Sequence, residues 1–146
     1  MDWKNFGKGV FLVNVLGIVY DPKTKKILIG KREKDKYVPQ LSWCFPGGGP
    51  TYKHSLSMSL RMSIKRKTNL DVNVLDCIFA RTLPENPEIL LIYYFCEVVE
   101  DSEKPKAMDD LKEIKWVKPT EATKSFTTSV DPVISDFLDA LEKGEI

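Results

Sequence analysis

Cysteine and histidine are scarce in this chain. The 146 residues include three cysteines and one histidine, and no Cys-x-x-Cys pair occurs. A zinc site is therefore not expected. Cys77 and Cys96 fall in strand-like segments, where we expect free cysteine to behave as a small hydrophobic residue. An odd number of widely spaced cysteines favours a reduced, intracellular setting.

A large net charge and a long apolar run are also lacking. The 22 basic and 21 acidic residues leave a net charge of +1, which gives no argument for binding nucleic acid or a membrane surface. The longest apolar stretch near the start, residues 11–20, contains Asn14 and is too short to span a bilayer. The first six residues lack the layout of a signal peptide. We expect a cytoplasmic protein without a membrane or nucleic-acid partner.

The composition is that of a folded domain. Hydrophobic residues make up 42% of the chain and charged residues 29%, which is typical of globular proteins. A chain of this length suits one hydrophobic core. There are no internal repeats, low-complexity tracts or linkers, so we predict one domain over residues 1–146.

Strand-like and helix-like segments mix along the chain. Runs of β-branched and other apolar residues predict strands at residues 11–20, 26–32, 42–45, 70–81, 89–99 and 113–117. A helix is predicted over residues 55–68, with Leu56, Leu60 and Ile64 as a buried stripe and Asn69 as a left-handed end. A second helix is predicted over residues 130–141. This mixture predicts an α/β fold, in which a mixed β-sheet lies between helices.

The segment around the glycines carries a specific motif. Trp43–Gly48 reads WCFPGG and precedes the first predicted helix. It resembles the approach to the Nudix box, G-x5-E-x7-R-E-U-x-E-E-x-G-U, where U is a bulky aliphatic residue. With Gly48 as the first box glycine, Ile64 and Leu70 fall on the aliphatic positions and Asn69 falls on the second glycine.

The resemblance extends to the flanking strands. Residues 27–32 resemble the family's strand before the Nudix loop, and residues 114–117 resemble a late strand that carries tryptophan. The resemblance therefore covers nearly the whole chain. It implies a Nudix-like α/β/α sandwich with a mixed β-sheet.

In this register the acidic positions of the box are not acidic. The first glutamate falls on His54, the glutamate after the box arginine on Ser63, and the adjacent glutamate pair on Arg66 and Lys67. Nudix enzymes hold divalent ions through these glutamates and split a diphosphate linkage. Magnesium prefers hard oxygen ligands, and cationic side chains repel it. We therefore predict no metal site and no cofactor; magnesium would be needed only if the protein is nevertheless a hydrolase.

The cations in the box point to a different kind of ligand. Arg66 and Lys67 lie on the helix face that holds the metal in the family, and there they can bind a phosphate group directly. The glycines can turn the chain sharply into the helix and offer backbone amides to an anion. The alternative is a solvated basic helix face left after catalysis was lost. The predicted ligand-binding residues are Arg32, Gly47, Gly48, Gly49, Arg66 and Lys67.

Three functions stay open at this level. The first is a pseudoenzyme that binds a nucleotide or another phosphorylated small molecule. The second is a hydrolase of nucleoside-diphosphate-linked compounds that uses groups other than the box glutamates, with Asp109, Asp110, Glu113 and His54 as candidate catalytic residues. The third is a protein-interaction or regulatory domain. Cations in place of glutamates favour the first, whereas the sequence leaves the ligand and the oligomeric state open.

Overall fold

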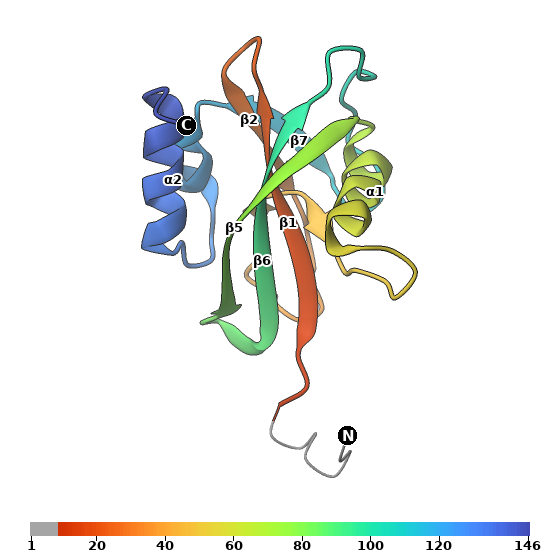
Figure 1. Cartoon of the computed structure of the whole chain (residues 1–146). Helices are drawn as coiled ribbons and strands as arrows, with labels where there is room; N and C mark the ends of the chain where they lie inside the picture. Colours follow the sequence, from red (N-terminus) through yellow and green to blue (C-terminus); the bar gives the residue numbers. More distant parts are fainter. Residues whose placement is uncertain (1–8) are drawn as a thin grey trace.

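A mixed β-sheet runs through the molecule (Figure 1). The computed structural model describes residues 9–146. The strands are β1 (Leu12–Asp21), β2 (Lys26–Lys31), β3 (Trp43–Cys44), β4 (Gly47–Gly48), β5 (Val72–Leu83), β6 (Asn86–Val98) and β7 (Glu113–Val117). The helices are α1 (Leu56–Thr68) and α2 (Pro132–Glu142), and a 3-10 helix, η2 (Pro119–Ser125), precedes α2.

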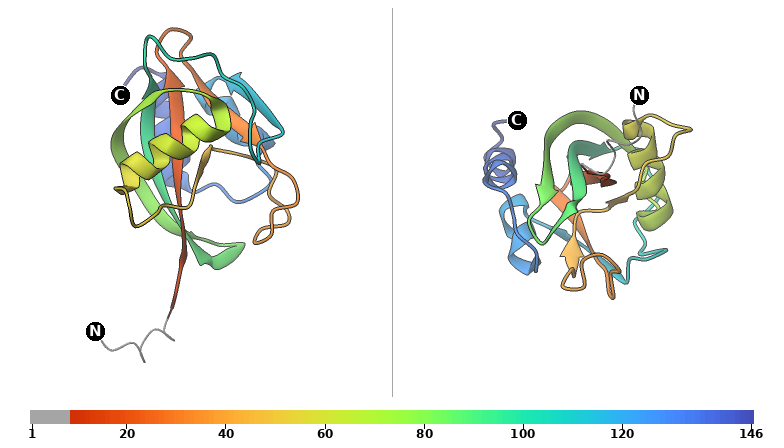
Figure 2. Two further views of the ribbon diagram at one scale, coloured as in Figure 1. Left: turned by 90° about the vertical axis from the view of Figure 1, so that its right-hand side faces the viewer. Right: turned by 90° about the horizontal axis from the view of Figure 1, so that it is seen from below.

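The order of the strands makes the sheet mixed. The main path is β3-β2-β1-β6-β5, with β4 paired to β1 and β7 paired to β2. Only β1 and β6 run parallel among the strand pairs of residues 9–146. Figure 2 shows α1 crossing one face of the sheet while α2 lies against the other. The predicted α/β sandwich is therefore confirmed.

Each helix buries its apolar side in a separate hydrophobic cluster. Leu60 and Ile64 of α1 pack with Val15, Val19, Leu28, Leu70, Val72 and Cys96. On the α2 side, Ile134, Leu138 and Leu141 belong to a cluster that includes Ile18, Phe45 and Phe95. The prediction that Leu56 is buried with Leu60 and Ile64 is wrong, because its side chain is 40% exposed. The buried face of α1 begins at Ser59, after the first turn.

Both ends of α1 carry residue types that commonly cap helices. The Ser55 hydroxyl accepts a hydrogen bond from the amide of Met58 at 3.1 Å, a common N-cap arrangement. Asn69 ends the helix with a left-handed φ of 65°, as predicted. Beyond it, the amides of Lys106 and Met108 donate to the carbonyls of Thr68 and Lys67. The long loop before β7 is thus tied to the C-terminal end of α1.

The glycine segment departs from the expected sharp turn into the helix. Gly47 and Gly48 pair with Leu16 and Val15 of β1 as strand β4, and α1 begins only at Leu56. A Cβ on Gly47 would lie 2.0 Å from the carbonyl oxygen of Val15, so only glycine lets the two backbones approach this closely. These glycines therefore pack against the sheet and do not sit at a helix N-terminus.

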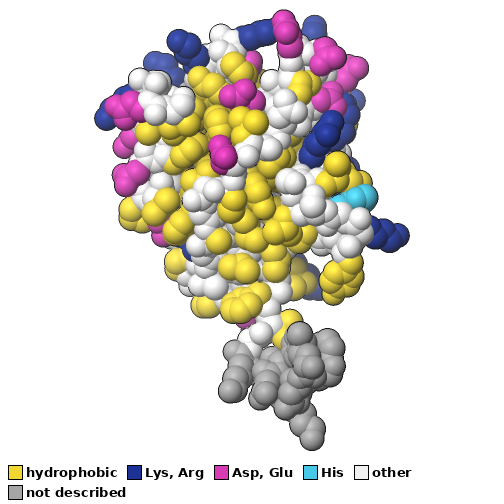
Figure 3. All heavy atoms as spheres, viewed as in Figure 1, with side chains coloured by type: hydrophobic (Ala, Val, Ile, Leu, Met, Phe, Trp, Pro, Cys, Tyr) yellow, Lys and Arg dark blue, Asp and Glu magenta, His cyan; other side chains and the backbone are white. Residues whose placement is uncertain are grey.

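Strand β5 forms an edge of the sheet and exposes apolar side chains. Figure 3 shows hydrophobic side chains gathered along the middle of this face, and Leu75 of β5 is among the exposed ones.

The two cysteines expected to behave as small hydrophobic residues differ in their burial. Cys96 is buried, as such a residue would be, whereas Cys77 is exposed. Within the described residues, no helix is long and apolar enough to cross a membrane.

Candidate functional site

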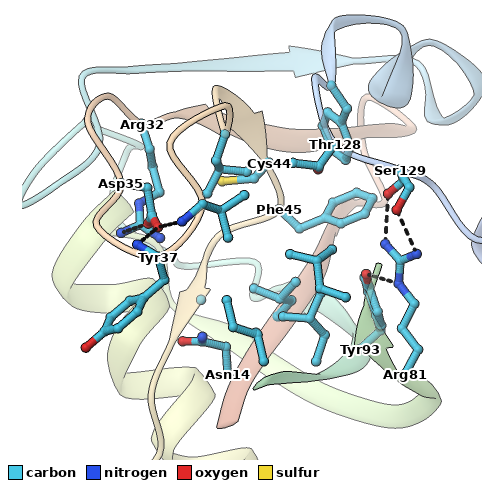
Figure 4. Close-up of a pocket in the computed structure, with 18 of the residues that line it drawn as sticks. Asn14, Arg32, Asp35, Tyr37, Cys44, Phe45, Arg81, Tyr93, Thr128 and Ser129 are labelled. Carbon is cyan, nitrogen blue, oxygen red and sulfur yellow. Dashed lines mark hydrogen bonds and ion pairs between the residues drawn. The ribbon is translucent and has the colours of Figure 1, made fainter. Parts of the chain in front are cut away.

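An apolar cavity of about 340 Å³ lies between the sheet and the segment that leads into α2. Its volume is within the range of small-molecule pockets. Residues from β1, β5, β6, the glycine segment and residues 126–134 line it (Figure 4). Its hydrophobic walls include Leu16, Leu41, Phe45, Leu83, Leu91, Phe126 and Ile134. Phe45 and Phe126 meet edge to face at 5.0 Å between ring centroids.

A hydrogen-bonded group lies at one end of this cavity (Figure 4). Arg81 donates to the Tyr93 hydroxyl at 3.2 Å, and to the hydroxyl and carbonyl oxygens of Ser129 at 3.2 and 2.8 Å. The Ser129 hydroxyl also bonds to Glu85 at 2.8 Å. Burial raises the pKa of Tyr93, so its hydroxyl stays protonated near neutral pH. This end can offer hydrogen bonds to a ligand.

At the other end of the cavity lies a charge cluster, which comprises Arg32, Asp35, Arg66, Lys67, Asp109 and Asp110. Arg32 pairs with Asp35 at 2.9 Å and with Asp110 at 3.2 Å. Lys67 pairs with the same oxygen of Asp110 at 3.4 Å, and Arg66 pairs with Asp109 at 3.3 Å. The cations of the box are thus neutralised by carboxylates from the loop before β7.

Lys67 is the most buried member of this cluster. It is only 6% exposed, although lysine is rarely buried. Its ammonium donates to the carbonyl oxygen of Gly47 at 2.6 Å, which ties α1 to the glycine segment. Arg66, by contrast, has a side chain that is 58% exposed. The two box cations therefore sit in different surroundings.

Cys44 lines the cavity close to the charge cluster. Burial raises the pKa of its thiol to about 11, although Arg32 and Lys67 act in the opposite direction. A thiol with this pKa is protonated at neutral pH, and the thiolate is the reactive form. Cys44 therefore lines the cavity as a neutral thiol.

Comparison with known proteins decides the family. The model of the NUDIX domain matches residues 10–137 of this chain. The chain belongs to the NUDIX domain family. No curated protein sequence matches this Nudix domain.

Solved structures agree with this assignment at the level of the fold. The domain is similar to a MutT protein from Methanosarcina mazei Go1, with a TM-score of 0.68 and 16% identity, covering 94% of this chain and 97% of that one. A NUDIX hydrolase from Nitrosomonas europaea gives a TM-score of 0.68 at 14% identity over 91% and 71%. An ADP-ribose pyrophosphatase from Streptococcus suis 89-1591 gives 0.61 at 11% identity over 91% and 90%.

The residues of this Nudix domain do not fit a magnesium ion at the box. The box positions on α1 offer the buried hydroxyl of Ser63 and the two cations Arg66 and Lys67. Over residues 9–146, no three or more histidine, cysteine, aspartate or glutamate side chains are grouped so that they could hold a metal. Magnesium favours several oxygen ligands in octahedral geometry, and this set of donors does not supply them.

The structure brings some of the predicted site residues together and separates others. Arg32 and Gly47–Gly49 line the cavity, whereas Arg66 and Lys67 are not among its lining residues. Asp109 and Asp110 lie against the box cations. His54 and Glu113 are both exposed, His54 in the loop before α1 and Glu113 at the start of β7. The ligand-binding and catalytic roles of these residues stay predictions.

Sequence reasoning did not single out several lining residues. Arg81, Phe126 and Ser129 come from a strand end and from the segment between η2 and α2. Their spacing in the sequence does not indicate a shared site, because only the fold brings these residues together. Tyr93, which also lines the cavity, is buried on the central strand β6. An aromatic residue on a central strand is a weak sequence signal for such a cavity.

Proposed function

We propose that this Nudix domain binds a nucleotide-type ligand without the magnesium-dependent hydrolysis of its family. The observation that carries the proposal is the charge cluster. All glutamate positions of the box hold other residues, and the cations at two of them pair with Asp109 and Asp110. Asp109 and Asp110, two of the candidate catalytic carboxylates, are thus held in ion pairs with the box cations.

The cavity suits the ring system of such a ligand. Its walls carry Phe45, Phe126 and Tyr93, and aromatic side chains favour stacked or edge-to-face contact with a planar ring. At one end of the cavity, Arg81, Tyr93 and Ser129 supply hydrogen-bonding groups for the edge of the ring. A base bound here would be recognised by both shape and polarity.

The opposite end suits the phosphate groups. Arg32 is both a lining residue of the cavity and a member of the charge cluster. Its guanidinium is planar and can donate two parallel hydrogen bonds to two oxygens of a phosphate. A ligand whose ring fills the cavity would direct its phosphates toward Arg32 and the glycine segment. In this proposal, Arg32 supplies the positive charge that a metal supplies in the family.

Hydrolysis is the second candidate function. It is favoured by the family and by similar folds in proteins described as a NUDIX hydrolase and an ADP-ribose pyrophosphatase. It requires catalytic groups other than the box glutamates, namely Asp109, Asp110, Glu113 or His54. Ligand binding and turnover can be measured separately, so one set of titrations followed by product analysis distinguishes the two functions.

The binding role is tested by titrating ADP-ribose calorimetrically in the presence of EDTA. Arg32→Gln should weaken binding about tenfold to a hundredfold, since a charge-assisted hydrogen bond is worth about 1.5–3 kcal/mol. Lys26→Gln is the matched control, because it removes the same charge from the exposed start of strand β2, which ends one residue before Arg32. The control should change the affinity less than about twofold. Equal losses in both variants, or no binding by the unmodified protein, would refute the proposal.

A further inference from the structure

The proposed anion site is already occupied by a carboxylate of the protein itself, that of Asp110. A single oxygen of Asp110 lies 3.2 Å from Arg32 and 3.4 Å from Lys67. Lys67 in turn bonds to Gly47 of the glycine segment. The Asp110 carboxylate therefore occupies a position between the cation at the cavity, the buried box cation and the glycines.

The turn that carries Asp110 is fixed by contacts that do not involve its side chain. The amide of Leu111 donates to the carbonyl of Met108, and Lys112 donates to Lys31 of β2. The Leu111 side chain is buried against Gly30, where an added Cβ would lie 2.8 Å from it. The backbone of residues 108–112 can therefore stay in place while the carboxylate moves.

The contacts of the Asp110 carboxylate are incomplete. Its Oδ1 atom is shielded from solvent and has no hydrogen-bond partner among residues 9–146. Both ion pairs are made by Oδ2 alone, at distances longer than the 2.7–2.9 Å of a strong charge-assisted bond. A phosphate group offers more oxygens to the same cations. An anionic ligand can therefore compete with this carboxylate.

We propose that Asp110 is an internal counter-ion, which neutralises Arg32 and Lys67 in the empty site and is displaced by the phosphate of a ligand. This inference rests on the proposed function, because it concerns the same anion site. Asp110 then sets the affinity of the domain for anions. Removing its negative charge leaves Arg32 and Lys67 in excess over Asp35, and it also removes a repulsive charge from the ligand's path.

The test uses two probes, inorganic pyrophosphate for the anion site and adenosine for the cavity. Asp110→Asn should bind pyrophosphate at least about tenfold more tightly than the unmodified protein, without magnesium, and should bind adenosine equally well. Asp71→Asn is the matched control. It removes a carboxylate of similar exposure, which pairs with Lys65 of α1 outside the charge cluster, and it should change pyrophosphate affinity less than about threefold.

The outcomes separate this inference from the proposed function. Unchanged or weaker pyrophosphate binding by Asp110→Asn overturns the internal counter-ion, whatever adenosine does. Failure of adenosine to bind any variant, together with tighter pyrophosphate binding, refutes the base cavity but supports the counter-ion. Asp110→Ala serves as a second variant, and thermal unfolding checks that each is folded. If neither variant folds, the inference is also overturned, because a carboxylate that the fold requires cannot leave when a ligand binds.

Discussion

Replacing Gly47 with alanine should destabilise the domain by at least about 3 kcal/mol, the upper part of the range for overpacked sites. The new Cβ would lie 2.0 Å from the Val15 carbonyl oxygen and 2.9 Å from the Cα of Leu16. Both are backbone atoms of the central strand β1, so a side chain cannot simply turn aside. Relief requires β4 to move off β1. That movement also carries away the carbonyl to which Lys67 donates.

Gly49 provides a matched control for this change. A Cβ at Gly49 would lie 3.7 Å from the Val13 carbonyl oxygen, which is an ordinary contact. Gly49→Ala should therefore change the free energy of unfolding by less than about 0.5 kcal/mol. Denaturant unfolding of both variants measures the difference. Similar stabilities for the two variants would show that the glycine segment does not pack against β1 as described.

Leu60→Ala should destabilise the domain by about 2–5 kcal/mol, the range for a large-to-small change in a core. Leu60 is fully buried in the cluster beneath α1, so the deletion leaves a cavity lined by Val15, Ile64 and their neighbours. Leu56→Ala makes the same chemical change one helical turn earlier, where the side chain is 40% exposed. It should cost less than about 1 kcal/mol. Equal losses in the free energy of unfolding, measured in urea, would mean that α1 presents a different face to the sheet.

Helix α1 shows how far sequence reasoning reaches. Its end at Asn69 and the burial of Leu60 and Ile64 could be predicted, because capping and periodicity are local properties. The exposure of Leu56 could not be predicted from the same period. It depends on where along α1 the contact with the sheet begins, and the buried face starts only at Ser59. The packing of α1 on the sheet therefore decides whether Leu56 is buried.

The candidate site was predictable only in part for the same reason. The box register placed cations on one face of α1, and the flanking WCFPGG segment placed glycines nearby. The partners of those cations come from 43 residues further along the chain, and the path of the loop before β7 brings them there. That path is set by backbone hydrogen bonds to the end of α1. A sequence pattern therefore could not reveal that Asp109 and Asp110 neutralise the box.

The role of metal in this Nudix domain is best tested by titrating ADP-ribose in magnesium and again in EDTA, with product analysis of both samples. Because Arg32 supplies the positive charge at the proposed phosphate site, the two dissociation constants should agree within about twofold. The recovered ligand should be intact. Binding that strengthens tenfold or more with magnesium, or ADP-ribose that is split into AMP and ribose phosphate, would contradict a metal-independent site and place this chain among the hydrolases of its family.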